Sequence, residues 1–436
     1  MSPPDEGPRP GSPIFGRAGG ALRVGEFTVQ HLAESHGTPL YVYDAAAMRG
    51  QLAALRAHLP DAISVYYSVK ANPNPAVIRC LVEAGAGCEI ASAAEYLRAR
   101  AAGCPRESIL FAGPGKGEEE LAHVLAAGIG EIHVESTEEI AMLGSIAARL
   151  GVSVDVSIRV NPAQSAAGGA MQMGGLPAAF GIDEERLEEI VATVRGTPGL
   201  RLRGLHMFAG TQILEAEVLV RQWRHAVALA VRLAEIAGTP PDTVDLGGGL
   251  GIPYFPHEKP LDLARVRELA GELFASLPAS LAGTRFVLEP GRYLVGPCGL
   301  YLSRVRSVKR SRGTTFVVLD GGMHHHLAAS GNLGQVIKRD YPIVNASRLD
   351  EEASLTAVVV GPLCTPLDTL GRKAQLPAST AVGDLVAVLQ SGAYGLSASP
   401  VGFLSHPMPA EVLVDGGRAT RVRERGSFEQ PLVALP

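Results

Sequence analysis

The sequence predicts an α/β fold, a (β/α)8 barrel of the TIM type followed by a C-terminal β-domain. Short apolar segments recur from residue 65 onward, and each precedes an Ala/Leu/Glu-rich segment with apolar residues at helical spacing. After residue 290 the pattern changes to alternating β-rich segments with Gly and Asp turns. A chain of 436 residues, 46% hydrophobic, is long enough for two such units.

Eight segments are expected to form the barrel strands. They are residues 65–69, 88–91, 109–112, 131–134, 155–160, 201–207, 243–246 and 285–289. Helix-like segments such as "AAEYLRARAAG" and "RHAVALAVRLAEIAG" lie between them and end in glycine. A doubly wound open sheet has the same alternation, so the strand pattern alone does not decide between the two folds.

The polar residues favour the barrel because they fall at the ends of the predicted strands. In a barrel, all strand ends meet at the C-terminal rim, where active sites are built. The residues in these positions are Lys70, Glu89, Ser92, Arg159, Asn161, His206, the "GGGLG" of residues 247–251, Glu289 and Arg292.

The second half of the chain is predicted to form a separate β-domain. Its expected strands are residues 301–309, 314–320, 355–361, 384–392 and 410–415. The segment 38–44 precedes the first barrel unit and is expected to join this domain. We therefore predict a disordered leader (1–20), a barrel (45–290), and a β-domain made of 21–44 with 291–436.

Composition excludes several classes of protein. The net charge of −5 gives no basic surface for nucleic acid, and no apolar run is long enough to cross a membrane. The Pro/Gly-rich start lacks the apolar core of a signal peptide. Five cysteines without a CxxC pair indicate reduced thiols and a cytoplasmic location.

Three rim features together predict pyridoxal 5'-phosphate as cofactor. Lys70 offers an amine for a Schiff base, and the glycines of 247–251 allow backbone N–H groups to approach a phosphate. Glu289 would keep the pyridine nitrogen protonated, which favours loss of an α-carboxylate over racemisation. His206 is a candidate to stack on the ring, although a buried core histidine is the more common role of such a residue.

At this point the chain resembles the fold-type III pyridoxal-phosphate decarboxylases, whose barrel and β-domain are of the alanine-racemase type. This group holds diaminopimelate decarboxylase and the eukaryotic-type ornithine decarboxylases. The resemblance runs in order from about residue 38 to 396. It rests on "TPLYVYD", "YYSVKANPNP", "CEIASAAE", "RVNP", "FGID", "GGGLG", "EPGRYLVGP", "GPLCTPLD" and "SGAYG".

The resemblance implies roles for individual residues. Lys70 is then the Schiff-base lysine, His206 stacks on the cofactor, and Cys364 is the general acid that returns a proton after carbon dioxide leaves. Glu289 meets the pyridine nitrogen. The residues expected around the phosphate are Thr211, Gly247, Gly248, Gly249, Gly291, Arg292 and Tyr394. The family pairs subunits head to tail, so a homodimer with shared active sites is implied, in which Cys364 reaches the partner's Lys70.

The chain departs from diaminopimelate decarboxylases where these enzymes read the far end of the substrate. Thr365 follows Cys364 in place of a glutamate, and "DGGMHHHLAASGN" replaces the segment with a carboxylate-binding Arg-Pro. This pattern resembles relatives that act on larger conjugates. We therefore expect an amino-acid conjugate as substrate, with attachment to an acyl-carrier protein in natural-product biosynthesis as one form of it. The alternative is diaminopimelate as a free amino acid.

Substrate contacts are predicted for four residues, Arg159, Asp320, Thr365 and Asp368. The run His324, His325 and His326 is not expected to bind a metal, because consecutive strand residues point to opposite faces. Lining of the substrate entrance or a structural role is expected instead.

Two other classes of protein share this barrel. Some relatives bind pyridoxal phosphate without turnover, but these generally lack the β-domain and the cysteine motif. Decarboxylase-like proteins that only bind partners typically lose the lysine, the cysteine or the phosphate loop, and this chain retains all three. The sequence therefore favours a decarboxylase.

Overall fold

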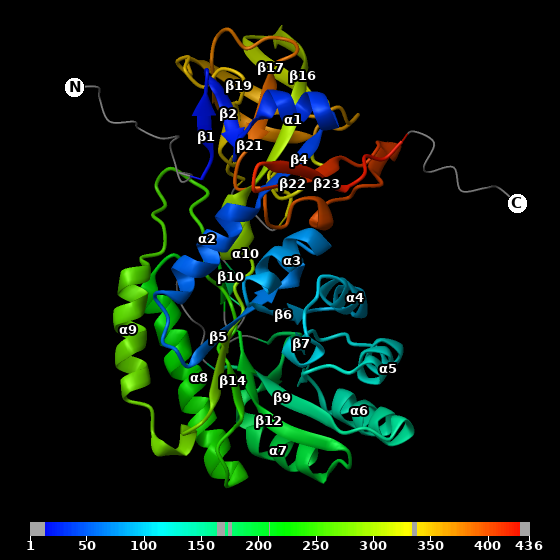
Figure 1. Ribbon diagram of the computed structural model, residues 1–436, viewed down its shortest axis with the longest axis vertical. Helices are drawn as coiled ribbons and strands as arrows, with labels where there is room; N and C mark the ends of the chain where they lie inside the picture. The colour runs from blue at the N-terminus through cyan, green and yellow to red at the C-terminus, as the bar shows by residue number, and fades with distance from the viewer. Residues whose placement is uncertain (1–13, 164–170, 173–176, 209, 334–337, 428–436) are drawn as a thin grey trace, which may run out of the picture. The chain divides into compact units, whose positions relative to one another are not determined.

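The computed structural model describes residues 14–163, 171–172, 177–208, 210–333 and 338–427. It divides the chain into two compact units. We call Gln51–Ile252 with Pro260–Tyr293 the barrel unit, and Met1–Gly50 with Pro253–Lys259 and Leu294–Pro436 the β unit. Figure 1 shows the elements of both units.

Eight parallel strands form a closed barrel in the order β9, β12, β14, β15, β5, β6, β7, β8, and β8 pairs back with β9. This closure confirms the predicted barrel and excludes the open sheet. β11 (Ile182–Asp183) is added beside β9. The barrel strands are β5 (Ile63–Ser68), β6 (Gly87–Ile90), β7 (Ile109–Phe111), β8 (Glu131–Val134), β9 (Val154–Asn161), β12 (Leu200–Met207), β14 (Thr243–Asp245) and β15 (Arg285–Leu288).

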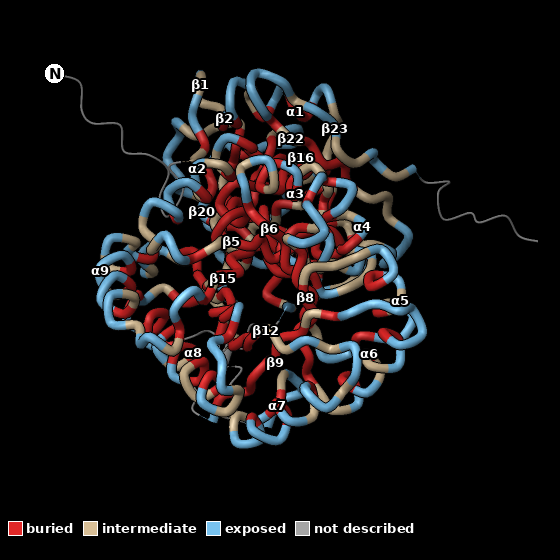
Figure 2. Tube along the Cα trace, turned by 60° about the horizontal axis from the view of Figure 1, so that its bottom comes forward, coloured by how far each residue is buried: buried red, intermediate tan, exposed pale blue. Residues whose placement is uncertain are grey.

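Helices surround the barrel, with exposed outer faces and buried strands inside (Figure 2). In α6 the buried residues Ile140, Leu143 and Ala147 recur every three or four positions, so one stripe faces the strands. Ser136 begins this helix by accepting the N–H of Glu139. The helices are α3 (Pro75–Glu83), α4 (Ala93–Ala101), α5 (Glu118–Ala127), α6 (Thr137–Leu150), α7 (Leu187–Gly196), α8 (Ala216–Ala237) and α9 (Leu263–Ala275).

The β unit contains a sheet in the order β20, β19, β17, β16, β4, β22, β23, with β21 pairing β16 and β18. β4 pairs antiparallel with β16 and parallel with β22, so the segment 38–44 contributes its strand to this sheet. The strands are β4 (Leu40–Asp44), β16 (Gly299–Ser311), β17 (Thr314–Leu319), β18 (Ile343–Asn345), β19 (Leu355–Val360), β20 (Thr369–Leu376), β21 (Leu385–Val388), β22 (Ala410–Asp415) and β23 (Arg418–Arg423).

The start of the described chain differs from the predicted leader of residues 1–20. β1 (Gly16–Ala18) pairs with β2 (Ala21–Val24), and Phe15 is buried in the core of the β unit. Burial of this large aromatic side chain stabilises the segment and offsets the conformational entropy that is lost when it becomes ordered. Residues 1–13 lie outside the described part of the chain.

The unit boundaries also fall elsewhere than the sequence indicates. Residues 45–50 and 253–259 group with the β unit, although the predicted barrel spanned 45–290. Within the β unit, Gln390 donates to the carbonyl of Pro253, and Tyr254 packs on Tyr341. Among the described residues, no helix has both the length and the apolarity needed to span a membrane.

Candidate active site

Two Asn-Pro steps place Lys70 at the rim of the barrel. β5 ends at Ser68, and the short turn Val69–Ala71 carries the lysine. Asn72 then accepts hydrogen bonds from the hydroxyl of Tyr67 (2.9 Å) and the N–H of Asn74 (3.1 Å). Asn74 caps α3 by accepting the N–H of Ala76 at 3.0 Å. The chain thus turns directly from strand to helix and leaves Lys70 at the strand end.

The amine of Lys70 lies against a buried carboxylate. Its Nζ is 3.1 Å and 3.3 Å from the two oxygens of Glu89, which also accepts a hydrogen bond from Ser68. Burial alone would raise the pKa of Glu89, but the charge of Lys70 and the bond from Ser68 outweigh it and lower the pKa. The Lys70 side chain is 46% exposed, so a carbonyl compound can reach the amine.

The glycine loop after β14 is closely surrounded by backbone. A Cβ on Gly247 would lie 2.6 Å from the carbonyl oxygen of Met207, and one on Gly249 would lie 2.6 Å from that of Gly210. A Cβ on Gly248 would overlap the carbonyl oxygen of Glu289. Gly247 and Gly249 also have positive φ values of 70° and 92°. Only glycines fit this loop.

Gln212 connects the glycine loop to the loop after β12. Its side chain bonds both to the carbonyl (2.5 Å) and to the N–H (3.2 Å) of Ile252. The backbones of Ile213 and Gly249 are joined at 2.9 Å. Thr211 lies one residue before the glutamine, in β13 (Gly210–Thr211), and so at the same loop.

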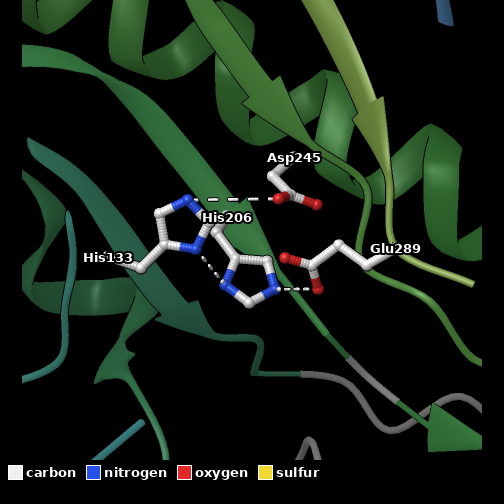
Figure 3. A group of neighbouring side chains, drawn as sticks. All are labelled: His133, His206, Asp245 and Glu289. Carbon is white, nitrogen blue, oxygen red and sulfur yellow. Dashed lines mark hydrogen bonds and ion pairs between the residues drawn. The ribbon is translucent and has the colours of Figure 1, made fainter. Parts of the chain in front are cut away.

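Four buried side chains from different strands meet inside the barrel (Figure 3). Nδ1 of His206 is 3.0 Å from Nδ1 of His133, and Nε2 of His206 is 3.5 Å from Oε2 of Glu289. Nε2 of His133 is 4.0 Å from Asp245 and 3.4 Å from Glu131. Asp245 also accepts the N–H of Gly247, which ties the cluster to the glycine loop.

The electrostatics of this cluster differ from those at Lys70. Burial, the nearby carboxylate of Asp245 and the charge of Glu89 raise the pKa of Glu289 well above its usual value. Burial raises the pKa of Asp245 to about 7. Burial, followed by His133 and nearby cations, lowers the pKa of His206 well below its usual value. These shifts favour the protonated form of Glu289 and the neutral form of His206.

Arg159 and Asn161 end β9 at the same rim, each with a carboxylate partner. Arg159 donates to Glu135 at 2.7 Å, and Asn161 donates to Asp183 at 2.9 Å. Glu135 further accepts the N–H groups of Gly113 and Gly181. Arg159 is thus held in a buried ion pair, and its predicted substrate contact stays a prediction.

Gly291 and Arg292 follow β15, beside the turn of Lys70. A Cβ on Gly291 would lie 2.9 Å from the Cβ of Ala71 and 3.0 Å from that of Ser68. Arg292 begins the short helix α10 (Arg292–Val295). The structure therefore brings these two residues next to the lysine turn, in agreement with their order in the barrel.

The remaining predicted residues lie in the β unit. Cys364, Thr365 and Asp368 lie in the turn between β19 and β20, Asp320 directly follows β17, and Tyr394 lies after β21. Cys364 is exposed, and Thr365 Oγ1 accepts the N–H of Leu367 at 3.3 Å. Asp320 accepts from the hydroxyl of Thr38 and the N–H of Arg304.

Asp368 is buried, and its two oxygens accept the N–H groups of Met323 (2.6 Å) and Leu363 (2.8 Å). The structure gives this carboxylate the role of fixing the turn that carries Cys364. Tyr394 has a positive φ of 52°, a backbone conformation that a non-glycine residue adopts only under strain. The predicted ligand contacts of Asp320, Thr365, Asp368 and Tyr394 stay predictions.

The histidines of residues 324–326 are all buried in the β unit. His325 bonds to the hydroxyl of Tyr301 (3.2 Å) and the carbonyl of Pro407 (3.0 Å). His326 bonds to Ser391 (2.9 Å) and accepts the N–H of Ala329 (3.3 Å). These contacts support the structural role that was one of the two expected.

Sequence reasoning did not single out His133, Glu131 or Asp245. His133 and His206 are 73 residues apart, and only the pairing of β8, β9 and β12 brings them together. Both His133 and Asp245 lie in predicted strands whose interior positions are normally apolar. Two polar residues in such strands were the available signal.

The residues of the barrel fit pyridoxal phosphate. Oε1 of Glu289 is buried without a hydrogen-bond partner among the described residues, and it can bond a ring nitrogen. The glycine loop leaves no room for side chains where a phosphate would need backbone N–H groups. The accessible amine of Lys70 completes the set of groups that this cofactor requires.

Comparisons with known proteins agree with this site. The family described as pyridoxal-dependent decarboxylase, pyridoxal binding domain, matches residues 45–296. A relative from Niallia circulans, the L-glutamyl-[BtrI acyl-carrier protein] decarboxylase, is 37% identical over 94% of this chain and 96% of its own. A diaminopimelate decarboxylase from Aquifex aeolicus is 33% identical over 94% of each chain.

Solved structures show the same similarity across both units. The diaminopimelate decarboxylase from M. jannaschii, in a co-complex with L-lysine, superimposes with a TM-score of 0.89 at 25% identity, covering 98% of each chain. Fold, site and sequence therefore lead to one conclusion. The chain belongs to the family of pyridoxal-dependent decarboxylases.

Proposed function

We propose that this pyridoxal-phosphate-dependent carboxy-lyase removes the α-carboxylate of an amino acid bound to an acyl-carrier protein. The observation that carries the proposal is the similarity, over 94% of the chain, to a decarboxylase whose substrate is a glutamyl-carrier protein. The diaminopimelate decarboxylases are less identical, at 33% for the protein from Aquifex aeolicus. A place in natural-product biosynthesis is part of the same proposal.

The structure supports this substrate at the two positions where a charged side chain would read a free amino acid. Thr365, next to Cys364, uses its hydroxyl to accept a backbone N–H of its own turn. The segment 324–326 is buried, and burial lowers the pKa of His324 to about 4, so this histidine is neutral at pH 7. Neither position therefore offers a charged side chain to a second amino-acid group of a free substrate.

The barrel residues divide the chemistry among them. Bound pyridoxal phosphate supplies the electron sink for the charge left when carbon dioxide departs. Glu89 holds the amine of Lys70 at 3.1 Å while half of the side chain stays accessible. Glu289, which is buried, offers its unpartnered Oε1 to the ring nitrogen. The glycine loop leaves its backbone open to the phosphate.

We assign the final proton transfer to Cys364, whose thiol lies on the exposed turn after β19. In keeping with the resemblance to the family, we propose that this thiol acts in the active site of a second subunit. A homodimer with shared sites follows from that assignment. After random exchange of equal amounts of Lys70→Ala and Cys364→Ala proteins, about half of the dimers are mixed, and each mixed dimer keeps one intact site of two. The mixture should then recover roughly a quarter of the wild-type activity. No recovery after subunit exchange would contradict shared sites.

The substrate is tested by carbon dioxide release from the cofactor-loaded protein. Glutamate and diaminopimelate are offered in free form, as small pantetheine thioesters of the distal carboxyl group, and loaded on a carrier protein through that group. Ornithine and lysine, which have a single carboxyl group, are offered in free form only. Turnover of the loaded carrier alone is the expected result. Turnover of the small thioesters at the same kcat/KM would show that the thioester, and not the carrier, is recognised. Fast turnover of free diaminopimelate would overturn the proposal and establish the alternative substrate.

A further inference from the structure

His133 lies in β8, directly behind the predicted cofactor-stacking histidine. The two rings are 4.6 Å apart between centroids, and both side chains are buried (Figure 3). Their Nδ1 atoms are separated by 3.0 Å, a hydrogen-bond distance. Since both atoms are nitrogens, one of them must carry the proton and the other must be bare.

The surroundings of His133 decide which nitrogen is the donor. Its Nε2 faces oxygen acceptors, Oε1 of Glu131 at 3.4 Å and Oδ2 of Asp245 at 4.0 Å. These acceptors favour a proton on Nε2, and whenever His133 carries a single ring proton its Nδ1 is then bare. It follows that Nδ1 of His206 donates to His133.

The far side of His206 is determined by the same logic. With its proton on Nδ1, a neutral His206 presents a bare Nε2 to Glu289, 3.5 Å away. Burial and the neighbouring Asp245 raise the pKa of Glu289, which favours the protonated form of this carboxyl. Cations from neighbouring elements, Lys116, Arg159 and Lys70, disfavour a second proton on His206.

We propose that His133, supported by Glu131, is a positioning residue that holds His206 in the Nδ1-protonated tautomer and so directs its bare Nε2 toward Glu289. Nε2 lies 3.5 Å from Oε2 of Glu289, outside hydrogen-bond geometry in this structure, and the unpartnered Oε1 remains available for the cofactor's ring nitrogen. The inference concerns the cofactor site alone, so it is independent of the carrier-bound substrate and survives if that proposal fails.

The direct test is the tautomer of His206 in the cofactor-free protein, measured by ¹⁵N–¹H NMR of labelled imidazoles and assigned with a His206→Asn sample. The wild-type protein should show His206 protonated at Nδ1. His133→Phe keeps a ring but removes both nitrogens, and should move the proton of His206 to Nε2. His133→Asn places an amide oxygen near the former Nδ1, and should restore the wild-type tautomer.

Cofactor affinity gives a second measurement. Titration with pyridoxal phosphate, followed by absorbance, should show binding weakened by about 10–100-fold in His133→Phe and largely recovered in His133→Asn. This is the range known for residues that orient a metal-binding histidine through its other ring nitrogen. His123→Phe, at an exposed position on α5, is the matched control and should bind as the wild type does.

Three results would overturn the proposal. The first is a wild-type His206 protonated at Nε2, which needs no variant to fold. The second is an unchanged tautomer in His133→Phe. The third is stoichiometric zinc in the purified protein, because a metal ion would use the nitrogen lone pairs that the hydrogen bonds require.

Discussion

Acid should destabilise the β unit through its three buried histidines. Burial lowers the pKa of His324 to about 4, of His325 to about 2 and of His326 to about 3, from an ordinary value of 6.5. Between the folded-state pKa values and 6.5, these histidines are therefore protonated in the unfolded chain but stay neutral in the folded unit. The free energy of unfolding is fully present above pH 6.5 and falls as the pH drops from there toward the folded-state values.

The magnitude follows from linkage. Between pH 7 and 5.5 each histidine should remove about 1.3 kcal/mol from the free energy of unfolding, and the three together about 4 kcal/mol. A typical domain has only about 5–15 kcal/mol in total. For His326 the geometry gives the same direction, because its Nδ1 already accepts the N–H of Ala329 and a second ring proton would oppose it.

The assay must separate the two units. Hydrogen exchange of β21 peptides in urea reports the β unit, while fluorescence of Trp223, the single tryptophan of the chain, reports the barrel. The barrel should lose less stability between pH 7 and 5.5. Its raised pKa values, to about 7 for Asp245 and in the same direction for Glu289, make the folded barrel bind protons at a higher pH than the unfolded chain does, and this opposes the destabilising effect of His206.

Two variants make the prediction decisive. His326→Phe removes one titrating group, so its loss of stability between pH 7 and 5.5 should be smaller than that of the wild type by about 1.3 kcal/mol, whatever its stability at pH 7. His31→Gln changes an exposed histidine of the same unit and should leave the pH dependence unaltered. Identical pH dependence in the wild type and His326→Phe would refute the reasoning.

Three further changes test the site. Gly248→Ala puts a Cβ against the carbonyl of Glu289, so it should lower the free energy of unfolding by about 1–3 kcal/mol and weaken cofactor binding in an absorbance titration. Gly271→Ala, with open space in α9, should raise the free energy of unfolding by up to about 1 kcal/mol. Equal effects of the two variants would contradict this. Asp368→Asn can accept only one of the two backbone amides, so unfolding in urea should become easier by about 1–3 kcal/mol, with faster hydrogen exchange at residues 361–369; unchanged exchange would argue against the turn-fixing role. Cys364→Ser should leave the absorbance of bound cofactor unchanged, while the rate of carbon dioxide release or the rate of formation of the correct product falls about 10²-fold. A wild-type rate with the wild-type product would exclude the thiol as the acid.

The barrel could be predicted because its signals are local. Each strand is a short apolar run, and each following helix repeats its apolar residues every three or four positions, so neighbours in sequence are enough to assign the elements. Lys70 and Glu89 follow from the same information, since the ends of adjacent parallel strands must meet. Their ion pair at 3.1 Å is a consequence of strand order alone.

Other features depend on contacts that no local pattern carries. The three histidines were interpreted as strand residues, but they lie in turns, where all three can be buried in one aromatic cluster. The inward turn of Asp368 to two backbone amides could not be predicted, because a sequence does not show which way a carboxylate points. His133 became visible only when the closed barrel placed β8 near β12.

Glu89 and Glu289 show why chemistry at the rim cannot be assigned from position alone. Both are glutamates at the ends of barrel strands, and both are buried. Glu89 has Lys70 and Ser68 beside it and a lowered pKa, whereas Glu289 faces Asp245 and has a raised one. The two carboxyl groups of the rim therefore differ because of their neighbours and not because of their residue type. The cation of Lys70 favours the ionised form of Glu89, whereas burial beside Asp245 favours the protonated form of Glu289.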